Sequence, residues 1–334
     1  MSKSNLKPSA ILSSLLVATL LTASSKPALA QSSADTYPSK VVTLVNPFVA
    51  GSTTDGDARP LLQYLTAALG KSFVVDYRPG AGGILGNNYV AKAKPDGYTL
   101  LIVSTSFTTN FALRDNVPYS YKDFAPVSLL SRRPVILVVT PSLPVKSFAE
   151  YLAYARANPD KLNWGTSGAG SIFHMAGAYL AAATGTKITF VHYKGNAQGF
   201  VDLVAGRTQV SPMTTFAALP YIKAGQVRPI AHLTASRSRA MPNLPSVAEL
   251  GVVGYDYSGW GAILTTGGSP ATVVNKLATA IAAYTRLPDA AARAVREGYE
   301  LESSTPEALG KIIESEVARW GKVARENNIK AGDE

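Results

Sequence analysis

Four short loops rich in small residues are the parts of this sequence best suited to chemistry. They cover 46–55, 78–86, 165–171 and 193–197, and each leaves an apolar run and enters a run with helical spacing. Small side chains leave backbone N–H groups accessible, and the start of a helix carries a partial positive charge. In open α/β sheets such loops lie at the carboxyl ends of strands, where ligands bind. One such loop could be only a tight turn, but four together predict an anion-binding cleft.

Motifs for catalysis fit the same loops poorly. The run GTSGA at 165–169 lacks the last glycine of the G-x-S-x-G nucleophile elbow. The glycines within 80–86 are spaced one residue off the dinucleotide fingerprint, and no P-loop occurs. His174, His192 and His232 are too far apart for typical metal-ligand spacing, and the chain has no cysteine. We therefore expect no catalytic residues, no metal and no cofactor.

The first thirty residues have the features of a secretory signal peptide. Lys3 and Lys7 precede an apolar run from Ile11 to Leu21, and Ala28-Leu29-Ala30 offers small residues for cleavage before Gln31. That apolar run is about half of the roughly 20 residues that a membrane span needs. We therefore expect residues 1–30 to be removed and the mature protein to work outside the cytoplasm.

Charge and cysteine content narrow the class of protein further. The formal net charge is +10, and loss of the three lysines within residues 1–30 leaves +7. A positive surface favours anionic partners, but the Lys and Arg residues are scattered, which is not typical of nucleic-acid binding. Without cysteines no disulfide can form, so a hydrophobic core must hold the chain together. About 300 residues suffice for two domains.

Strands and helices alternate along the first third of the mature chain. We expect strands at 41–45, 73–75 and 98–103, and helices at 61–69 and 84–93. This order predicts parallel βαβ units.

A second series begins after Arg132-Arg133, with expected strands at 135–139, 162–164, 188–191 and 227–233 and helices from Ser147, from Ile172 and up to Leu203. Two C-terminal helices follow, capped by Ser269-Pro270 and Thr305-Pro306. Because these helices need a sheet to cover, we expect a discontinuous first lobe, 38–134 plus 259–334, and a second lobe, 135–258.

Several of these motifs, in this order and spacing, resemble a known family. They are Tyr37-Pro38-Ser39-Lys40, Asn46 to Asp55 with Ala58-Arg59, Arg78 to Gly83, Pro95 to Leu100, Asn163 to Ser171 with His174, His192 to Gly195, and Pro245 to Glu249. From Tyr37 to about Lys322 the chain is similar to the substrate-binding proteins of tripartite tricarboxylate transporters, the Bug family of periplasmic receptors.

The resemblance implies a type II periplasmic-binding-protein fold, in which two α/β lobes joined by a hinge enclose a ligand cleft. It implies a periplasmic, monomeric, non-enzymatic protein that binds a small organic carboxylate, either a di- or tricarboxylate or an aromatic carboxylate. It also implies a membrane permease with one large and one small integral subunit as partner. A periplasmic ligand sensor that docks on a signalling partner is the alternative, and a periplasmic enzyme is a third reading.

The resemblance also implies ligand-binding residues. They are Phe48, Ala50, Gly51, Ser52, Thr53, Thr54, Asp55, Ser104, Ser106, Thr166, Ser167, Gly170, Ser171, His174 and Gln209. Val49 and Ser52 depart from the Pro and Gly usual in the family's first loop. Gln209 stands where many members carry Asp, which argues against a ligand with an amino group.

Overall fold

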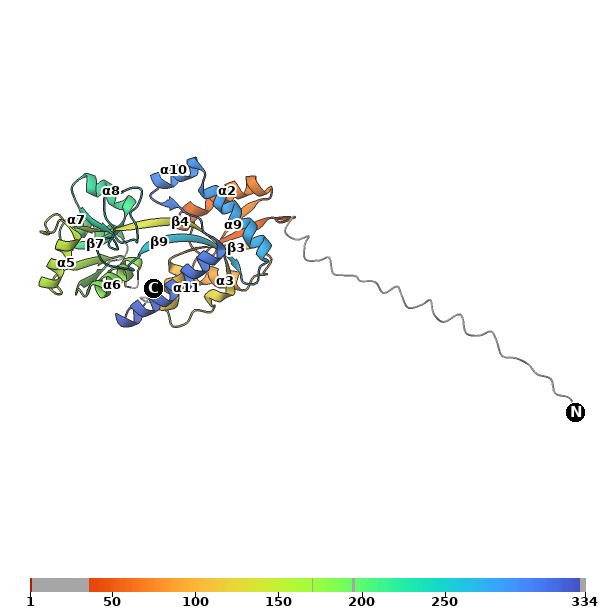
Figure 1. Cartoon of the computed structure of the whole chain (residues 1–334), viewed down its shortest axis with the longest axis horizontal. Helices are drawn as coiled ribbons and strands as arrows, with labels where there is room; N and C mark the ends of the chain where they lie inside the picture. The colour runs from red at the N-terminus through yellow and green to blue at the C-terminus, as the bar shows by residue number, and fades with distance from the viewer. Residues whose placement is uncertain (2–35, 170, 194–195, 331–334) are drawn as a thin grey trace. The chain divides into compact units, whose positions relative to one another are not determined.

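In the computed structural model, Pro38–Glu334 forms one unit and Met1–Tyr37 forms another. The structure describes Met1 and residues 36–169, 171–193 and 196–330 (Figure 1). The predicted signal peptide, residues 1–30, lies outside the described residues apart from Met1. The fold below is that of the second unit.

Three parallel strands begin this unit. β1 (Val42–Asn46) pairs with β2 (Phe73–Tyr77) on one side and β3 (Thr99–Ser104) on the other. The intervening helices are α2 (Thr53–Leu69), η1 (Ala81–Gly83) and α3 (Ile84–Ala91), and α4 (Ser106–Leu113) and η2 (Tyr121–Asp123) follow β3. The predicted βαβ units are confirmed.

Helix α2 begins earlier than the sequence pattern predicts. The Ser52 side chain accepts a hydrogen bond from the Asp55 N–H at 3.4 Å and caps the helix, so Thr53, Thr54 and Asp55 belong to its first turn and not to the loop. The helix ends at Gly70, whose φ of 70° is readily adopted only by glycine. The predicted loop 46–55 is therefore three residues shorter than expected.

The second series forms another set of parallel strands. β5 (Asn163–Thr166) pairs with β6 (Thr189–His192) and with β7 (Val210–Thr214). The other elements of this series are α5 (Phe148–Ala157), α6 (Ile172–Thr184), α7 (Asn196–Val204), α8 (Thr215–Lys223) and β8 (Arg228–His232). The sequence pattern did not predict β7, α8 or α4.

Two long strands join the two series. β4 (Phe124–Val139) and β9 (Ser258–Thr266) run side by side and antiparallel (Figure 1). β4 pairs with β9 up to Pro134, and from Val135 onward it pairs with β7 and β8. The resulting order over the described residues is β2-β1-β3-β9-β4-β7-β5-β6. The prediction of a strand that starts at residue 135 is wrong. One 16-residue strand, β4, runs through Arg132 and Arg133.

The C-terminal segment returns to the first series. It contains α9 (Ala271–Thr285), α10 (Pro288–Arg296), β10 (Glu300–Leu301) and α11 (Pro306–Glu326). α9 packs on α2 and β4, and α11 packs on α4 and β4 and also reaches α6. The cap at Thr305 is confirmed. The cap at Ser269 is not, because Pro270 holds the N-cap position and the Ser269 hydroxyl donates to the Thr266 carbonyl instead.

Large apolar side chains fill the interior on both sides of the long strands. Trp164, Trp260 and Trp320 are each at most 2% exposed. Across the described part of the chain, we find no helix whose length and apolar character would let it cross a bilayer.

Candidate functional site

The first predicted ligand loop is folded back onto the end of strand β1. Asn46 is fully buried there, and its Oδ1 accepts hydrogen bonds from the Phe48 N–H at 3.1 Å and the Thr54 hydroxyl at 2.8 Å. The Thr54 hydroxyl also lies 3.1 Å from the hydroxyl of Ser52. Asn46 therefore fixes the loop, although the sequence analysis did not single it out as a site residue.

Asp55 organises the same loop from the first turn of α2. Its carboxylate accepts the Gly51 N–H at 2.8 Å, Nε of Arg59 at 2.9 Å and the Tyr77 hydroxyl at 2.6 Å. Burial alone would raise the pKa of Asp55, but the hydrogen bonds from Gly51, Tyr77 and Arg59 outweigh burial and lower this pKa. Asp55 is thus an occupied, charged acceptor, suited to positioning Gly51 and unsuited to contacting an anion.

The loop at 78–86 approaches the first loop through its glycines. A Cβ on Gly86 would lie 2.8 Å from Cβ of Pro47, and one on Gly83 would lie 3.4 Å from Cζ of Phe48. Real Cβ atoms do not come as close as 2.8 Å, so Gly86 is needed for this contact. Phe48 is half-buried, and the neighbouring Ala50 is exposed.

Ser104 and Ser106 lie at the carboxyl end of β3, with their hydroxyls 3.0 Å apart. Because β1, β2 and β3 are parallel, their carboxyl ends at Asn46, Tyr77 and Ser104 share one edge of the sheet. The structure therefore brings the first-loop residues and the two serines to the same edge.

The second ligand loop follows β5 and leads into α6. The Ser171 side chain caps this helix by accepting the His174 N–H at 3.3 Å, and the Ser171 N–H donates to the Gly168 carbonyl at 3.1 Å. Ser167 and Ser171 are half-buried. Gly170 lies outside the described residues. With the His174 N–H taken by Ser171, the N–H groups of Ile172 and Phe173 in the first turn of α6 have no acceptor within the helix, so they can serve an anion.

Thr166 and two histidines form a cluster beside this loop. The Thr166 hydroxyl lies 2.7 Å from Nδ1 of His192, and the rings of His174 and His192 lie 4.7 Å apart. Burial, assisted by the neighbouring His192, lowers the pKa of His174 to about 4, and burial also lowers the pKa of His192. Both imidazoles are therefore mainly neutral at neutral pH.

Gln209 is placed away from this cluster. Its side-chain oxygen accepts the Asn163 N–H at 3.1 Å and its amide nitrogen donates to the Gly206 carbonyl at 3.2 Å. Asn163 begins β5 and Thr166 ends it, so Gln209 lies at the opposite edge of the sheet from the Thr166 loop. Its amide holds the turn before β7 together.

The described contacts thus gather the predicted residues into two groups. The first group contains Phe48 to Asp55 with Ser104 and Ser106, and the second contains Thr166, Ser167, Ser171 and His174. Neither 46–55 nor 165–171 contains Lys or Arg, so hydroxyls and backbone N–H groups are the donors available to an anion. Within the described residues, no group of three or more His, Asp or Glu side chains could hold a metal ion.

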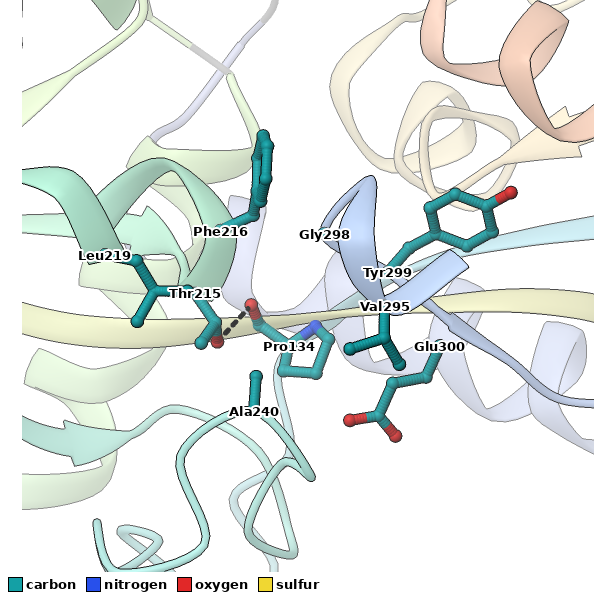
Figure 2. A pocket seen from close by; sticks show the side chains of 9 residues that line it. All are labelled: Pro134, Thr215, Phe216, Leu219, Ala240, Val295, Gly298, Tyr299 and Glu300. Atoms are coloured by element: carbon teal, nitrogen blue, oxygen red, sulfur yellow. Dashed lines mark hydrogen bonds between the residues drawn. The ribbon is translucent and has the colours of Figure 1, made fainter. Parts of the chain in front are cut away.

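A separate pocket lies where α8 faces the segment from α10 to β10 (Figure 2). Its cavity volume is only about 20 Å³, and it is lined mainly by apolar side chains, with Phe216 and Leu219 on one side and Val295 and Tyr299 on the other. None of the predicted ligand-binding residues lines it.

Comparison with known proteins gives a consistent result. Residues 58–329 match the model of the tripartite tricarboxylate transporter family receptor. Protein BugT of Bordetella pertussis is 32% identical over 301 residues, which cover 89% of this chain and 92% of BugT. An Agrobacterium vitis protein encoded in the TAR-I ttuE-ttuC' intergenic region is 35% identical over 319 residues, covering 94% of this chain and 92% of that protein.

Solved structures show the same likeness. An R. palustris protein solved with adipate is 37% identical, with a TM-score of 0.70, and the match covers 88% of this chain and 99% of that one. MatC from Rhodopseudomonas palustris, solved with bound malate, is 27% identical, with a TM-score of 0.66 and coverage of 86% and 99%. The periplasmic binding protein BugD is 30% identical, with a TM-score of 0.66 and coverage of 88% and 99%.

Proposed function

This chain belongs to the tripartite tricarboxylate transporter receptor family, and we propose that it captures a small organic carboxylate in the periplasm and delivers it to a membrane permease. The permease would have one large and one small integral subunit. The observation that carries the proposal is the pair of cation-free, hydroxyl-rich loops, each at the carboxyl edge of parallel strands and each entering a helix.

A carboxylate suits these loops because its oxygens accept several hydrogen bonds at once. Hydrogen bonds to a charged group contribute about 1.5–3 kcal/mol each, roughly twice as much as neutral ones. The ligands of two relatives, adipate and malate, are both dicarboxylates. We therefore propose a di- or tricarboxylate as the first class to test and an aromatic carboxylate as the second.

We also propose that the ligand lies between two lobes, 38–134 plus 259–334 and 135–258. The change of strand partner along β4 at Pro134 and Val135 supports the first boundary. The packing of α9 on α2 and of α11 on α4 supports the return of the C-terminal segment to the first lobe. In this proposal residues 1–30 are a cleaved signal peptide, and the mature chain acts as a monomer without catalysis.

A thermal-shift screen over mono-, di- and tricarboxylates, with neutral sugars as controls, tests the ligand class. A ligand that binds only the folded protein stabilises it by about 2.7 kcal/mol at one hundred times its Kd. We expect at least one carboxylate to raise the melting temperature clearly. A panel in which sugars stabilise the protein and carboxylates do not would contradict the proposal.

A second measurement tests closure of the two lobes. Ligand held from both sides should draw them together, so X-ray scattering should give a smaller radius of gyration at saturation. The sensor alternative predicts the same closure and differs only in its partner. Co-purification of the tagged receptor with the two permease subunits in detergent would favour transport over sensing.

A further inference from the structure

His192 is the exposed member of the cluster beside the second ligand loop. It ends β6 directly opposite Thr166 in the strand register, and Thr166 itself is only 3% exposed. Its ring is held on one side by the 2.7 Å contact between Nδ1 and the Thr166 hydroxyl and on another by the edge of His174. The imidazole is therefore fixed in orientation although it reaches the surface.

The hydrogen bonds of Thr166 determine which ring nitrogen of His192 carries the proton. The Thr166 hydroxyl accepts the Gly168 N–H at 3.3 Å, and its single proton can go to the Gly168 carbonyl at 3.3 Å or to His192 Nδ1 at 2.7 Å. The hydroxyl could instead accept from an Nδ1–H group, but 2.7 Å is the usual length for an O–H donor and is short for a ring N–H donor, which favours donation by Thr166 to Nδ1. A neutral imidazole that accepts at Nδ1 must carry its proton on Nε2.

We propose that His192 is a ligand-contacting residue that donates from Nε2 to a carboxylate of the ligand, with Thr166 as the positioning residue that fixes its tautomer. This inference rests on the proposed function, because it assigns one carboxylate of the captured anion to a donor that the loops alone do not supply. His192 was not among the residues predicted from the sequence to bind the ligand.

The charged and titratable groups around His192 decide how ligand binding depends on pH. β5 contributes no ionisable side chain, and α6 contributes His174, which stays neutral in this range. The next residue, Tyr193, donates to Asp202, whose carboxylate is already paired with Arg207. Lys194 lies outside the described residues.

A bound carboxylate stabilises the imidazolium form of His192, so binding raises its pKa and takes up a proton. Affinity must therefore increase as the pH falls through the range between the pKa of the free protein and that of the complex. Burial lowers the pKa of His192 in the free protein, so we expect the increase in affinity between neutral and mildly acidic pH.

Calorimetric titration of the mature protein with adipate, and with malate as a second probe, tests this. Between about pH 8 and about pH 6, where both probes are largely ionised, we expect the affinity to rise, with an upper limit of about tenfold for a pKa raised by about one unit on binding. An affinity that stays constant over this range would overturn the inference and leave the proposed function standing. If no carboxylate of the wider panel binds at either pH, the proposed function fails and the inference fails with it.

Two variants separate a ligand contact from a structural role. His192→Gln places a neutral donor near the position of Nε2, so it should bind within about twofold of the wild type at pH 8 and show no dependence on pH. His192→Asn keeps the hydrogen bond to Thr166 but is too short to reach the ligand, so its affinity should fall about tenfold. Equal binding by the wild type and both variants, with unchanged melting temperatures, would overturn the inference.

Nitrogen-15 NMR of the imidazole rings tests the geometry without a ligand. His192 should be in the Nε2–H tautomer in the wild type, and Thr166→Val should populate the Nδ1–H tautomer. An Nδ1–H tautomer in the wild-type protein would contradict the assignment of Thr166 as the donor, whatever the binding data show.

Discussion

Breaking the ion pair between Asp57 and Arg133 by changing one partner should be among the most destabilising single substitutions in this chain. Asp57 lies in α2, and its side chain is 1% exposed, while that of Arg133 in β4 is 17% exposed. The carboxylate accepts Nη2 of Arg133 at 2.7 Å, Nη1 at 3.0 Å and the Ser131 hydroxyl at 2.6 Å. Changing Asp57→Asn removes the charge while preserving the shape.

The expected loss of stability follows from the charge that stays buried when one partner of the pair is removed. Breaking a buried pair by removing one partner costs about 3–5 kcal/mol, because the other charge loses its compensation. Replacing both partners with apolar residues costs far less for the same reason. We therefore expect Asp57→Asn to lower the free energy of unfolding by about 3 kcal/mol, and Asp57→Leu combined with Arg133→Met to lower it by clearly less than the sum of the two single changes.

Urea unfolding followed by tryptophan fluorescence measures these differences. Lys322→Ala is the matched control, because Lys322 and Glu326 form an exposed pair at 3.8 Å, of the kind that contributes about 1 kcal/mol or less. A loss below about 1 kcal/mol for Asp57→Asn would refute the reasoning, since it would mean that the Arg133 guanidinium is already compensated by water.

Three further changes have expected outcomes that unfolding experiments can check. Gly177→Ala should destabilise the protein by about 1–3 kcal/mol, because its Cβ would lie 2.7 Å from the indole of buried Trp164; a loss of a few tenths would show that the indole can move aside. Thr305→Ala should cost about 1 kcal/mol through loss of the α11 cap, and Thr305→Ser should recover most of it. His174, whose pKa is lowered to about 4 in the folded protein, takes up a proton more readily when unfolded, so it should lower the stability by about 2 kcal/mol from pH 7 to pH 5. His174→Phe should make the slope shallower by that amount and leave the smaller contributions of His192 and His232.

Much of the fold follows from local patterns, but the long strands do not. Arg132 and Arg133 interrupt an apolar run and so predict a break, yet β4 continues through them because Asp57, 76 residues away, neutralises Arg133. β9 was not predicted because it contains two glycines. At Gly261 a Cβ would meet Ser131 Oγ at 2.6 Å and Asp57 Oδ2 at 2.9 Å, so glycine is required by a contact that no local window reveals.

The candidate site shows the same division between local and distant information. The helix start after Ser171 follows from capping chemistry that the sequence displays. The role of Asn46 and the hydrogen bond between Thr166 and His192 depend on strand register, which composition does not specify. Gln209 was predicted to bind the ligand from its position relative to the family's motif. In the structure its amide is hydrogen-bonded to the backbone of Asn163 and Gly206, which the sequence does not reveal.

The late position of β9 in the chain also bears on how the protein is made. β9 lies between β3 and β4, so the first parallel strands gain their central neighbour only after residues 258–266 have been synthesised. Trp260 of β9 and Trp320 of α11 then complete the buried interior. Contacts of such long sequence separation form slowly. A nascent chain therefore stays without its finished core until nearly all of it exists. If residues 1–30 direct export, as we propose, this delay keeps the chain in the unfolded state that a translocation channel requires.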